Sequence, residues 1–268
     1  MGPVDPHWLS RRRAPDRAGI SVRAAFMSPL AALAQIDLSQ AALFLDLDGT
    51  LAPIADRPER VGPDPHRTAL IRQLGEALTG RLAILSGRRI ADVDRILEGA
   101  VACVAGLHGL ERRDSAGRRQ SAPLAPGLAR ARAELHRLVE TRPGLLLEDK
   151  ELTLALHYRQ APKAAQAAAA LCRELAQTCA LSLQAGKMVL ELRAPGPDKG
   201  DSLTSYMHEP PFAGALPLFL GDDLTDEAGF RAAGGLGGGG LLVGPARPSE
   251  ARFRLRDVAH VLHWLTRA

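Results

Sequence analysis

The sequence of 268 residues predicts an α/β protein with a Rossmann-like parallel sheet as its core and an inserted α+β module. Toward both ends of the chain, short apolar runs alternate with helical periodicities. This β-α-β rhythm is typical of parallel sheets with right-handed crossovers. In the middle of the chain the rhythm changes, and close pairs of strands separated by turns indicate antiparallel hairpins.

Composition and charge exclude several classes of protein. A hydrophobic content of 46% and a charged content of 24% are ordinary for a globular domain. The net charge of +4 is mild and no basic run is interleaved with aromatics, so we expect no nucleic-acid partner. No apolar run is long enough to cross a bilayer, so we expect no membrane partner.

The three cysteines, Cys103, Cys172 and Cys179, lie in apolar or helical surroundings without metal-binding spacing. They predict a reducing compartment and no disulfide framework. We therefore expect a cytoplasmic protein, and a monomer. For the chain as a whole we expect a non-native or disordered extension over 1–35, the first part of the core over 36–114, the inserted module over 115–194 and the second part of the core over 195–268. The extension is rich in Arg and Pro and lacks periodicity, and Met27 is an alternative start.

The stretch AALFLDLDGTLAP, residues 41–53, organises the core. Its apolar run 41–45 predicts a buried strand, and Asp46 and Asp48 follow at the carboxyl end, where ligands of open α/β sheets bind. Side chains alternate along an extended segment, so both carboxylates point the same way and repel unless a cation lies between them. Gly49 permits a sharp turn, and Thr50 offers a hydroxyl to an anion. A solvated Asp-Gly turn is the alternative interpretation.

The first part of the core continues the same rhythm. Asp64 and Pro65 predict a helix start, and Gly80 ends the run. A strand over 81–85, a helix over 90–97 and a strand over 101–105 are expected next. Ser86 follows the second strand as Asp46 follows the first, so its hydroxyl either holds a phosphate oxygen or caps a helix.

The inserted module predicts two hairpins, each preceded by a helix. The expected elements are a helix over 127–140, strands over 145–149 and 152–158, a helix over 162–178, and strands over 180–184 and 187–193 joined by a turn at Ala185-Gly186. In the last strand, Lys187 and Glu191 share the face opposite Leu190. That charged face is either solvated or a surface that reads hydroxyl groups if the module closes over the first site.

The second part of the core adds two charged strand-end features. Asp198-Lys199-Gly200 begins a helix, where the ammonium and the helix N-terminus both favour an anion. A buried strand over 216–220 runs into GDDLTDE, whose acids form an oxygen cluster suited to Mg²⁺, although a helix start also favours acids. The glycine run 234–240 lacks the ending of a phosphate loop and predicts a flexible loop. A helix over 257–267 closes the chain.

Lysine is used sparingly. Of 34 basic residues only four are Lys, and Lys150, Lys187 and Lys199 fall in motif-like stretches, whereas Lys163 lies in an alanine-rich helix. Lysine supplies a compact ammonium on a flexible stem, so its restriction to these places hints at a site.

The motifs DLDGT, SGR, DKG and GDDLTDE, in this order at strand ends, resemble the haloacid dehalogenase (HAD) superfamily of phosphatases. The inserted module resembles the larger cap class of that superfamily. Within it, GLHGLE, EDKELTLALHYR, GKMVLELR, PGPDKG and FLGDDLTDE resemble the trehalose-6-phosphate phosphatases, over residues 41–244. The extension and the glycine run depart from the family pattern without touching a motif.

This resemblance implies a HAD-like fold and a Mg²⁺-dependent phosphatase that acts on a small sugar phosphate. It implies that Asp46 is the nucleophile that becomes an aspartyl phosphate, and that Asp48 is the general acid and base. Mg²⁺ would be held by Asp46, the main-chain carbonyl of Asp48 and Asp222, with support from Asp223 or Asp226. Thr50, Ser86 and Lys199 would bind the phosphoryl oxygens.

Charged residues near the motifs are the candidates for binding the glucose hydroxyls. They are Arg88, His108, Glu111, Lys150, Lys187 and Glu191. Two other functions stay open: another HAD-type sugar-phosphate phosphatase or phosphomutase, acting on sucrose phosphate or phosphomannose, and a receiver-like phosphoacceptor. Receiver modules are shorter and carry no cap, so the sequence favours an enzyme.

Overall fold

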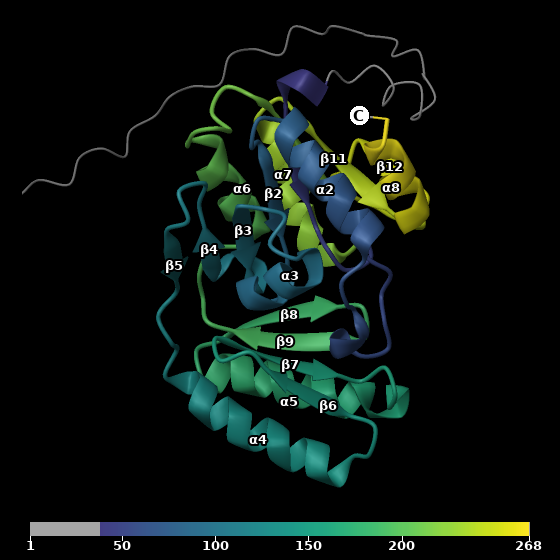
Figure 1. The fold of residues 1–268 in the computed structure, drawn as a ribbon. Helices are drawn as coiled ribbons and strands as arrows, with labels where there is room; N and C mark the ends of the chain where they lie inside the picture. Colours follow the sequence, from purple (N-terminus) through teal and green to yellow (C-terminus); the bar gives the residue numbers. More distant parts are fainter. Residues whose placement is uncertain (1–37, 268) are drawn as a thin grey trace, which may run out of the picture.

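The computed structural model describes residues 38–267, which form two sheets stacked along the long axis of the molecule (Figure 1). The larger sheet has eight strands in the order β12-β11-β10-β1-β2-β3-β4-β5, and the smaller has four in the order β6-β7-β9-β8. The predictions for the extension over 1–35 and for Met27 lie outside the described residues. Within 38–267, no helix combines the length and the apolar character needed to cross a membrane.

Six strands of the large sheet are parallel, which confirms the predicted Rossmann-like core. They are β1 (Ala41–Leu45), β2 (Leu82–Leu85), β3 (Cys103–Gly106), β10 (Leu216–Gly221), β11 (Gly239–Val243) and β12 (Phe253–Leu255). The antiparallel strands β4 (Glu111–Arg113) and β5 (Arg119–Ser121) extend one edge. The sequence analysis did not predict β4, β5 or β12.

Helices cover both faces of the large sheet because its central strand is apolar on both sides. Leu43 and Leu45 of β1 pack in one core cluster with α2 (Pro65–Ala77), α3 (Ile90–Leu97) and α8 (Val258–Leu265). Ala42 and Phe44 pack on the other face with α6 (Lys199–Met207) and α7 (Glu227–Gly235). From the sequence, a helix start at GDDLTDE was only an alternative interpretation, and no range was predicted for α7.

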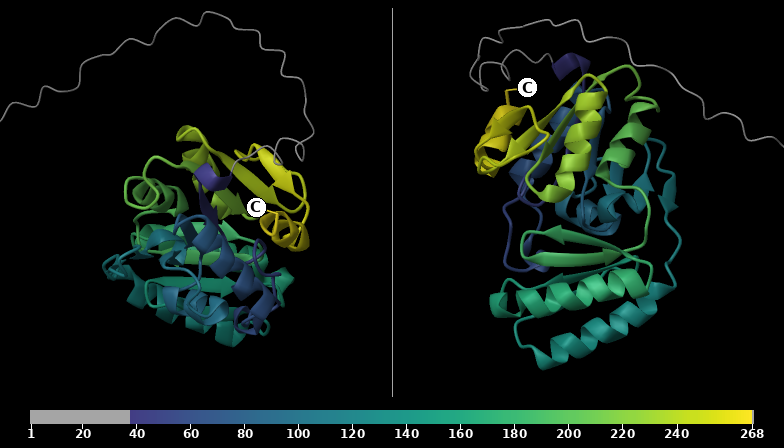
Figure 2. Two further views of the ribbon diagram at one scale, coloured as in Figure 1. Left: turned by 45° about the horizontal axis from the view of Figure 1, so that its top comes forward. Right: turned by 180° about the vertical axis from the view of Figure 1, so that it is seen from behind.

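The predicted insert forms a second sheet covered by helices on one face, which we call the cap. Its sheet contains β6 (Leu146–Asp149), β7 (Thr153–His157), β8 (Ser182–Gly186) and β9 (Val189–Arg193), all antiparallel to their neighbours. Helices α4 (Gly127–Thr141) and α5 (Ala165–Thr178) pack on one face of it through Leu135, Cys172 and Leu192. The other face is turned toward the large sheet, as the view from behind in Figure 2 shows.

Two local predictions are wrong. The β8–β9 turn lies at residues 187–188 rather than at Ala185-Gly186, so Lys187 stands in the turn and not in the strand. Part of the glycine run is also not a flexible loop, because Gly239 and Gly240 begin the buried strand β11. A Cβ on Gly240 would lie 2.5 Å from the ring of Phe230, so close packing against α7 explains glycine there.

The division into domains remains a prediction. The large sheet continues through β5 at residues 119–121, beyond the expected start of the insert at 115, and the small sheet ends at Arg193. All three cysteines are buried and free, in agreement with the expected absence of disulfides.

Candidate active site

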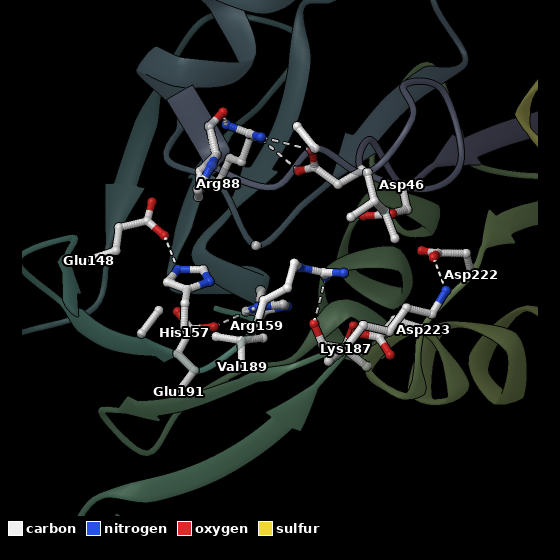
Figure 3. A pocket seen from close by; sticks show the side chains of 18 of the residues that line it. Asp46, Arg88, Glu148, His157, Arg159, Lys187, Val189, Glu191, Asp222 and Asp223 are labelled. Carbon is white, nitrogen blue, oxygen red and sulfur yellow. Dashed lines mark hydrogen bonds and ion pairs between the residues drawn. The ribbon is translucent and has the colours of Figure 1, made fainter. Parts of the chain in front are cut away.

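A cleft separates the carboxyl edge of the large sheet from the inner face of the cap sheet. Its empty volume, open solvent included, is about 970 Å³. Figure 3 shows side chains from both sheets pointing into it. Ionisable side chains line it from the core (Asp46, Asp48, Asp56, Arg88, His108, Lys199, Asp222, Asp223) and from the cap (Glu148, Lys150, His157, Arg159, Lys187, Glu191).

Asp46 leaves the end of β1 and forms a buried ion pair with Lys199. The Lys199 ammonium lies 2.7 Å from Asp46 Oδ1 and 2.6 Å from Asp226 Oδ1. Asp198 caps α6 by accepting from the amide of Asp201, and this cap sets the direction of the first turn that carries Lys199. Burial alone would lower the pKa of Lys199, but Asp226 and Asp46 raise it well above the usual value.

Asp222 follows β10 and lies against the turn after β1. Gly49 has φ +87°, and a Cβ there would be 2.1 Å from Asp222 Oδ2, so only glycine permits this approach. Burial raises the pKa of Asp222 to about 6, with Lys187 opposing the shift and Asp226 adding to it. The Lys187 ammonium, which comes from the cap, is hydrogen-bonded to Asp222 Oδ2.

These carboxylates fit a divalent cation. Asp46, Asp222 and Asp226 each offer an oxygen, and these atoms lie within 4.8 Å of one another. Carboxylate oxygens are the donors that hard cations such as Mg²⁺ prefer. Burial, together with Asp226 and Asp222, raises the pKa of Asp46 although Lys199 opposes it, so a further cation would favour its ionised form. Asp226 already accepts from Lys199 and from the amides of Asp222 and Asp223, which leaves Asp46 and Asp222 as the better ligands.

Asp48 is held by Arg88 in a two-pronged contact. Arg88 Nε lies 2.6 Å from Asp48 Oδ2, and Nη2 lies 2.8 Å from Oδ1. Arg88 Nη1 also donates to the carbonyl of Pro58, so the whole guanidinium is fixed. From the sequence, Arg88 was predicted to bind the substrate; in this structure it lines the cleft and contacts Asp48.

Two hydroxyls near the strand ends, those of Thr50 and Ser86, remain free to donate a hydrogen bond. Thr50 is fully buried, and its hydroxyl has no hydrogen-bond partner among the described residues. Ser86 is buried as well, and its oxygen accepts from the amide of Arg88 at 3.2 Å, which leaves its own hydrogen free to donate. Neither hydroxyl lines the cleft wall.

Glu191 joins the cap to the core. Its Oε1 accepts from Thr153, which belongs to the neighbouring strand β7, and from Lys150 at 3.4 Å, and its Oε2 lies 3.0 Å from Nε2 of His108. Burial would raise its pKa, but Lys150 and His108 hold it well below the usual value. Glu191 is only 5% exposed, so the solvated-face alternative for β9 is wrong at this position.

His108 comes from the turn after β3. Its φ of 56° is left-handed, and its amide donates to the carbonyl of Ser86 at 2.9 Å, which fixes the turn to the end of β2. Burial lowers the pKa of the imidazole, and Glu191 opposes the shift.

Three cap residues that line the cleft were not predicted from the sequence. Glu148 accepts from His157 at 2.9 Å across the β6–β7 pair, and Arg159 donates to the carbonyl of Lys187 at 3.0 Å. The block EDKELTLALHYR contains all three, so the signal was a hairpin with charged or ionisable residues at both of its ends, 148–151 and 157–159. That block alone does not show which face of the hairpin is turned toward the cleft, because this depends on which face α4 and α5 cover.

Comparison with known proteins identifies the family. The sequence model of the trehalose-phosphatase family matches residues 44–258. The trehalose-6-phosphate phosphatase of Escherichia coli K12 is 39% identical over 226 residues, covering 84% of this chain and 85% of that protein. The chain belongs to the trehalose-phosphatase family. A probable trehalose-phosphate phosphatase of Sinorhizobium fredii is also 39% identical, over 80% of this chain and 82% of its own length.

Solved structures agree with this membership of the trehalose-phosphatase family. A trehalose-6-phosphate phosphatase related protein superposes with a TM-score of 0.72 at 27% identity, covering 84% of this chain and 95% of that one. The C-terminal domain of the Candida albicans trehalose-6-phosphate phosphatase shares the fold, with a TM-score of 0.77 at 23% identity over 89% of this chain and 95% of that one.

In this member of the trehalose-phosphatase family, the structure brings most of the predicted site residues together. Those that line the cleft are Asp46, Asp48, Arg88, His108, Lys150, Lys187, Glu191, Lys199 and Asp222. Glu111 is not among them. The short strand β4 directs its carboxylate to the start of α3, where it accepts from the amide of Ile90 at 3.0 Å and lies 3.7 Å from Arg89.

Proposed function

We propose that this chain hydrolyses trehalose 6-phosphate to trehalose and phosphate through an aspartyl phosphate on Asp46, with Mg²⁺ as the cation. The step belongs to trehalose biosynthesis, as membership of the trehalose-phosphatase family implies. The observation that carries the proposal is the buried carboxylate of Asp46, paired with Lys199 at 2.7 Å and opening on the charged cleft.

In the first step, a carboxylate oxygen of Asp46 attacks phosphorus, and the bond from phosphorus to the sugar oxygen breaks. Asp48 gives its proton to that departing oxygen, so trehalose leaves as the neutral alcohol. Lys199 offsets the charge on the phosphoryl oxygens, and the hydroxyls of Thr50 and Ser86 are free to donate to them. In this structure both oxygens of Asp48 accept from Arg88, so Asp48 must give up one of these hydrogen bonds to carry the proton for the first step.

In the second step, Asp48 takes a proton from a water molecule that attacks the aspartyl phosphate. The bond between phosphorus and the Asp46 oxygen breaks, which releases phosphate and restores the carboxylate. Asp46, Asp222 and the main-chain carbonyl of Asp48 would hold Mg²⁺, which when bound neutralises charge on the transferring group. Asp226 would support the site through Lys199 and the amides of Asp222 and Asp223.

The cap supplies the groups that would bind the sugar. Lys150, Lys187 and Glu191, with His108 from the core, line the cleft opposite the acids. Glu148, His157 and Arg159 extend the same polar surface, with Val189 as an apolar element between them (Figure 3). This polar surface supports recognition of a substrate with many hydroxyl groups.

Phosphate release from trehalose 6-phosphate, with Mg²⁺ and with a chelator, tests this function. We expect turnover only with the metal, and an efficiency on trehalose 6-phosphate at least about 100-fold above that on glucose 6-phosphate, which lacks the second sugar's contacts. A preference for sucrose phosphate or mannose phosphate would contradict the assignment of the substrate. We also propose that the protein is cytoplasmic and monomeric. Light scattering on the purified chain would test the oligomeric state.

A further inference from the structure

The contact between Lys187 and Asp222 joins the cap to the acid cluster. Lys187 stands in the β8–β9 turn, and its ammonium crosses the cleft to the carboxylate of Asp222 (Figure 3). The turn is fixed on its cap side, because Arg159 donates to the carbonyl of Lys187 and the amide of Tyr158 donates to that of Met188, each at 3.0 Å. The ammonium therefore reaches Asp222 only when the cap is closed.

Asp222 has little freedom to avoid this contact. Its carboxylate is packed against Gly49, and its amide donates to Asp226 Oδ2 at 2.9 Å. It is also the carboxylate that, with Asp46, is best placed to bind the divalent cation. The ammonium of Lys187 and the cation of the proposed function therefore use the same buried group.

The charges of the cluster set the ammonium against the cation. The carboxylates of Asp46, Asp222 and Asp226 face the ammonium groups of Lys199 and Lys187. Asp223 lines the same cleft next to Asp222 and contributes a further negative charge. A divalent cation on Asp222 repels the ammonium that shares its carboxylate, and an anion such as phosphate would offset both positive charges.

We propose that Lys187 competes with the divalent cation for Asp222, so that metal binding opposes cap closure until the phosphate group of the substrate offsets the two positive charges. This inference rests on the metal site of the proposed function. By linkage, closure without substrate weakens metal binding to the same extent that the metal weakens closure.

Calorimetric titration of the substrate-free protein with Mg²⁺ tests the competition. Lys187→Gln removes the competing ammonium, and Lys163→Gln removes the same charge from an exposed cap position. We expect Lys187→Gln to bind Mg²⁺ about fivefold or more tightly than the wild type, and Lys163→Gln to match the wild type. An equal or weaker affinity in Lys187→Gln would overturn the inference while leaving the proposed function intact. Absence of Mg²⁺ binding by all three proteins would overturn both.

The reciprocal effect is measured on the cap itself. Spin labels at Gln73→Cys on α2 and Arg173→Cys on α5 occupy exposed positions on the core and on the cap, while the native cysteines are buried. We expect Mg²⁺ alone to shift the label-to-label distance in the Lys187 protein, and Mg²⁺ with inorganic phosphate to reverse the shift. In the Lys187→Gln background, Mg²⁺ alone should cause no shift. A distance that ignores Mg²⁺ in the Lys187 protein would overturn the inference.

Discussion

The two walls of the cleft are built in different ways. On the core wall, Asp46 and Asp222 stand at the ends of adjacent parallel strands, and each is held by a lysine. On the cap wall, Lys150 and Glu191 pair with one another, and each also contacts the core. Lys150 donates to the carbonyl of Gly87 at 2.9 Å, and Glu191 lies 3.0 Å from His108. The core wall thus supplies a charge arrangement for the reaction, and the cap wall supplies a polar surface that faces it.

The largest effect should come from the core wall. Asp46→Asn removes the attacking oxygen anion, so we expect turnover of trehalose 6-phosphate to fall by about 10⁴-fold or more, as for other lost nucleophiles. The variant should remain folded, because the neutral amide also removes repulsion from Asp222 and Asp226. Phosphate release and thermal melting measure both effects. Near-normal turnover would contradict the assigned role.

Lys199→Ala tests whether the core wall depends on its buried ion pairs. The substitution leaves Asp46 and Asp226 without their ammonium, and breaking a buried pair in this way costs about 3–5 kcal/mol of unfolding free energy. Urea denaturation measures the loss, and Lys163→Ala on the exposed cap surface serves as the control. Equal stability of the two variants would show that the cluster does not hold the core wall together.

Glu191→Gln separates the cap wall from the chemistry. We expect efficiency on trehalose 6-phosphate to fall roughly ten- to a hundredfold, the cost of one charge-assisted hydrogen bond, while a small aryl phosphate that does not reach the cap is hydrolysed at nearly the same rate. Because the carboxylate also binds Thr153 and Lys150, melting temperature is measured in parallel. Equal losses on both substrates would point to a defect of the whole cleft.

The smallest effect should come from the exposed contact between the walls. Arg89 of the core lies 2.7 Å from Glu151 in the cap, and the two side chains are 39% and 66% exposed. Exposed ion pairs contribute about 0.2–1 kcal/mol, so Glu151→Gln should change efficiency on trehalose 6-phosphate by less than about fivefold. Steady-state kinetics at low and high salt check this. A tenfold loss would show that this pair, rather than the buried contacts, holds the cap closed.

The same difference explains what could be predicted from the sequence. In a parallel sheet the carboxyl ends of the strands meet at one edge, so Asp46, Ser86 and Asp222 could be assigned to one place from their positions after apolar runs. Lys150, Lys187 and Lys199, the three lysines found in motif-like stretches, also line the cleft. The partner of each charge was less predictable, and the pairing of Arg88 with Asp48 depends on how two loops fold back over the strand ends.

The cap wall was harder to predict because local pattern does not fix which face of a hairpin is buried. A turn placed two residues early moved Lys187 into a strand, and Glu191 was left between two interpretations. Glu111 was misplaced for a related reason. The antiparallel extension of the sheet through β4 was not predicted, and this strand turns the carboxylate toward α3 instead of the cleft.

The most direct test of the account is to find the phosphoryl group on Asp46. The wild type and Asp48→Asn are mixed with saturating trehalose 6-phosphate and Mg²⁺, quenched in acid and treated with borohydride, which reduces an acyl phosphate. Mass spectrometry of the peptide that contains Asp46 then locates the reduced residue. We expect reduction at Asp46, with more of it in Asp48→Asn because that substitution slows release of the phosphoryl group. Turnover by the wild type without modification at Asp46 in either protein, or with modification at another carboxylate, would contradict the account.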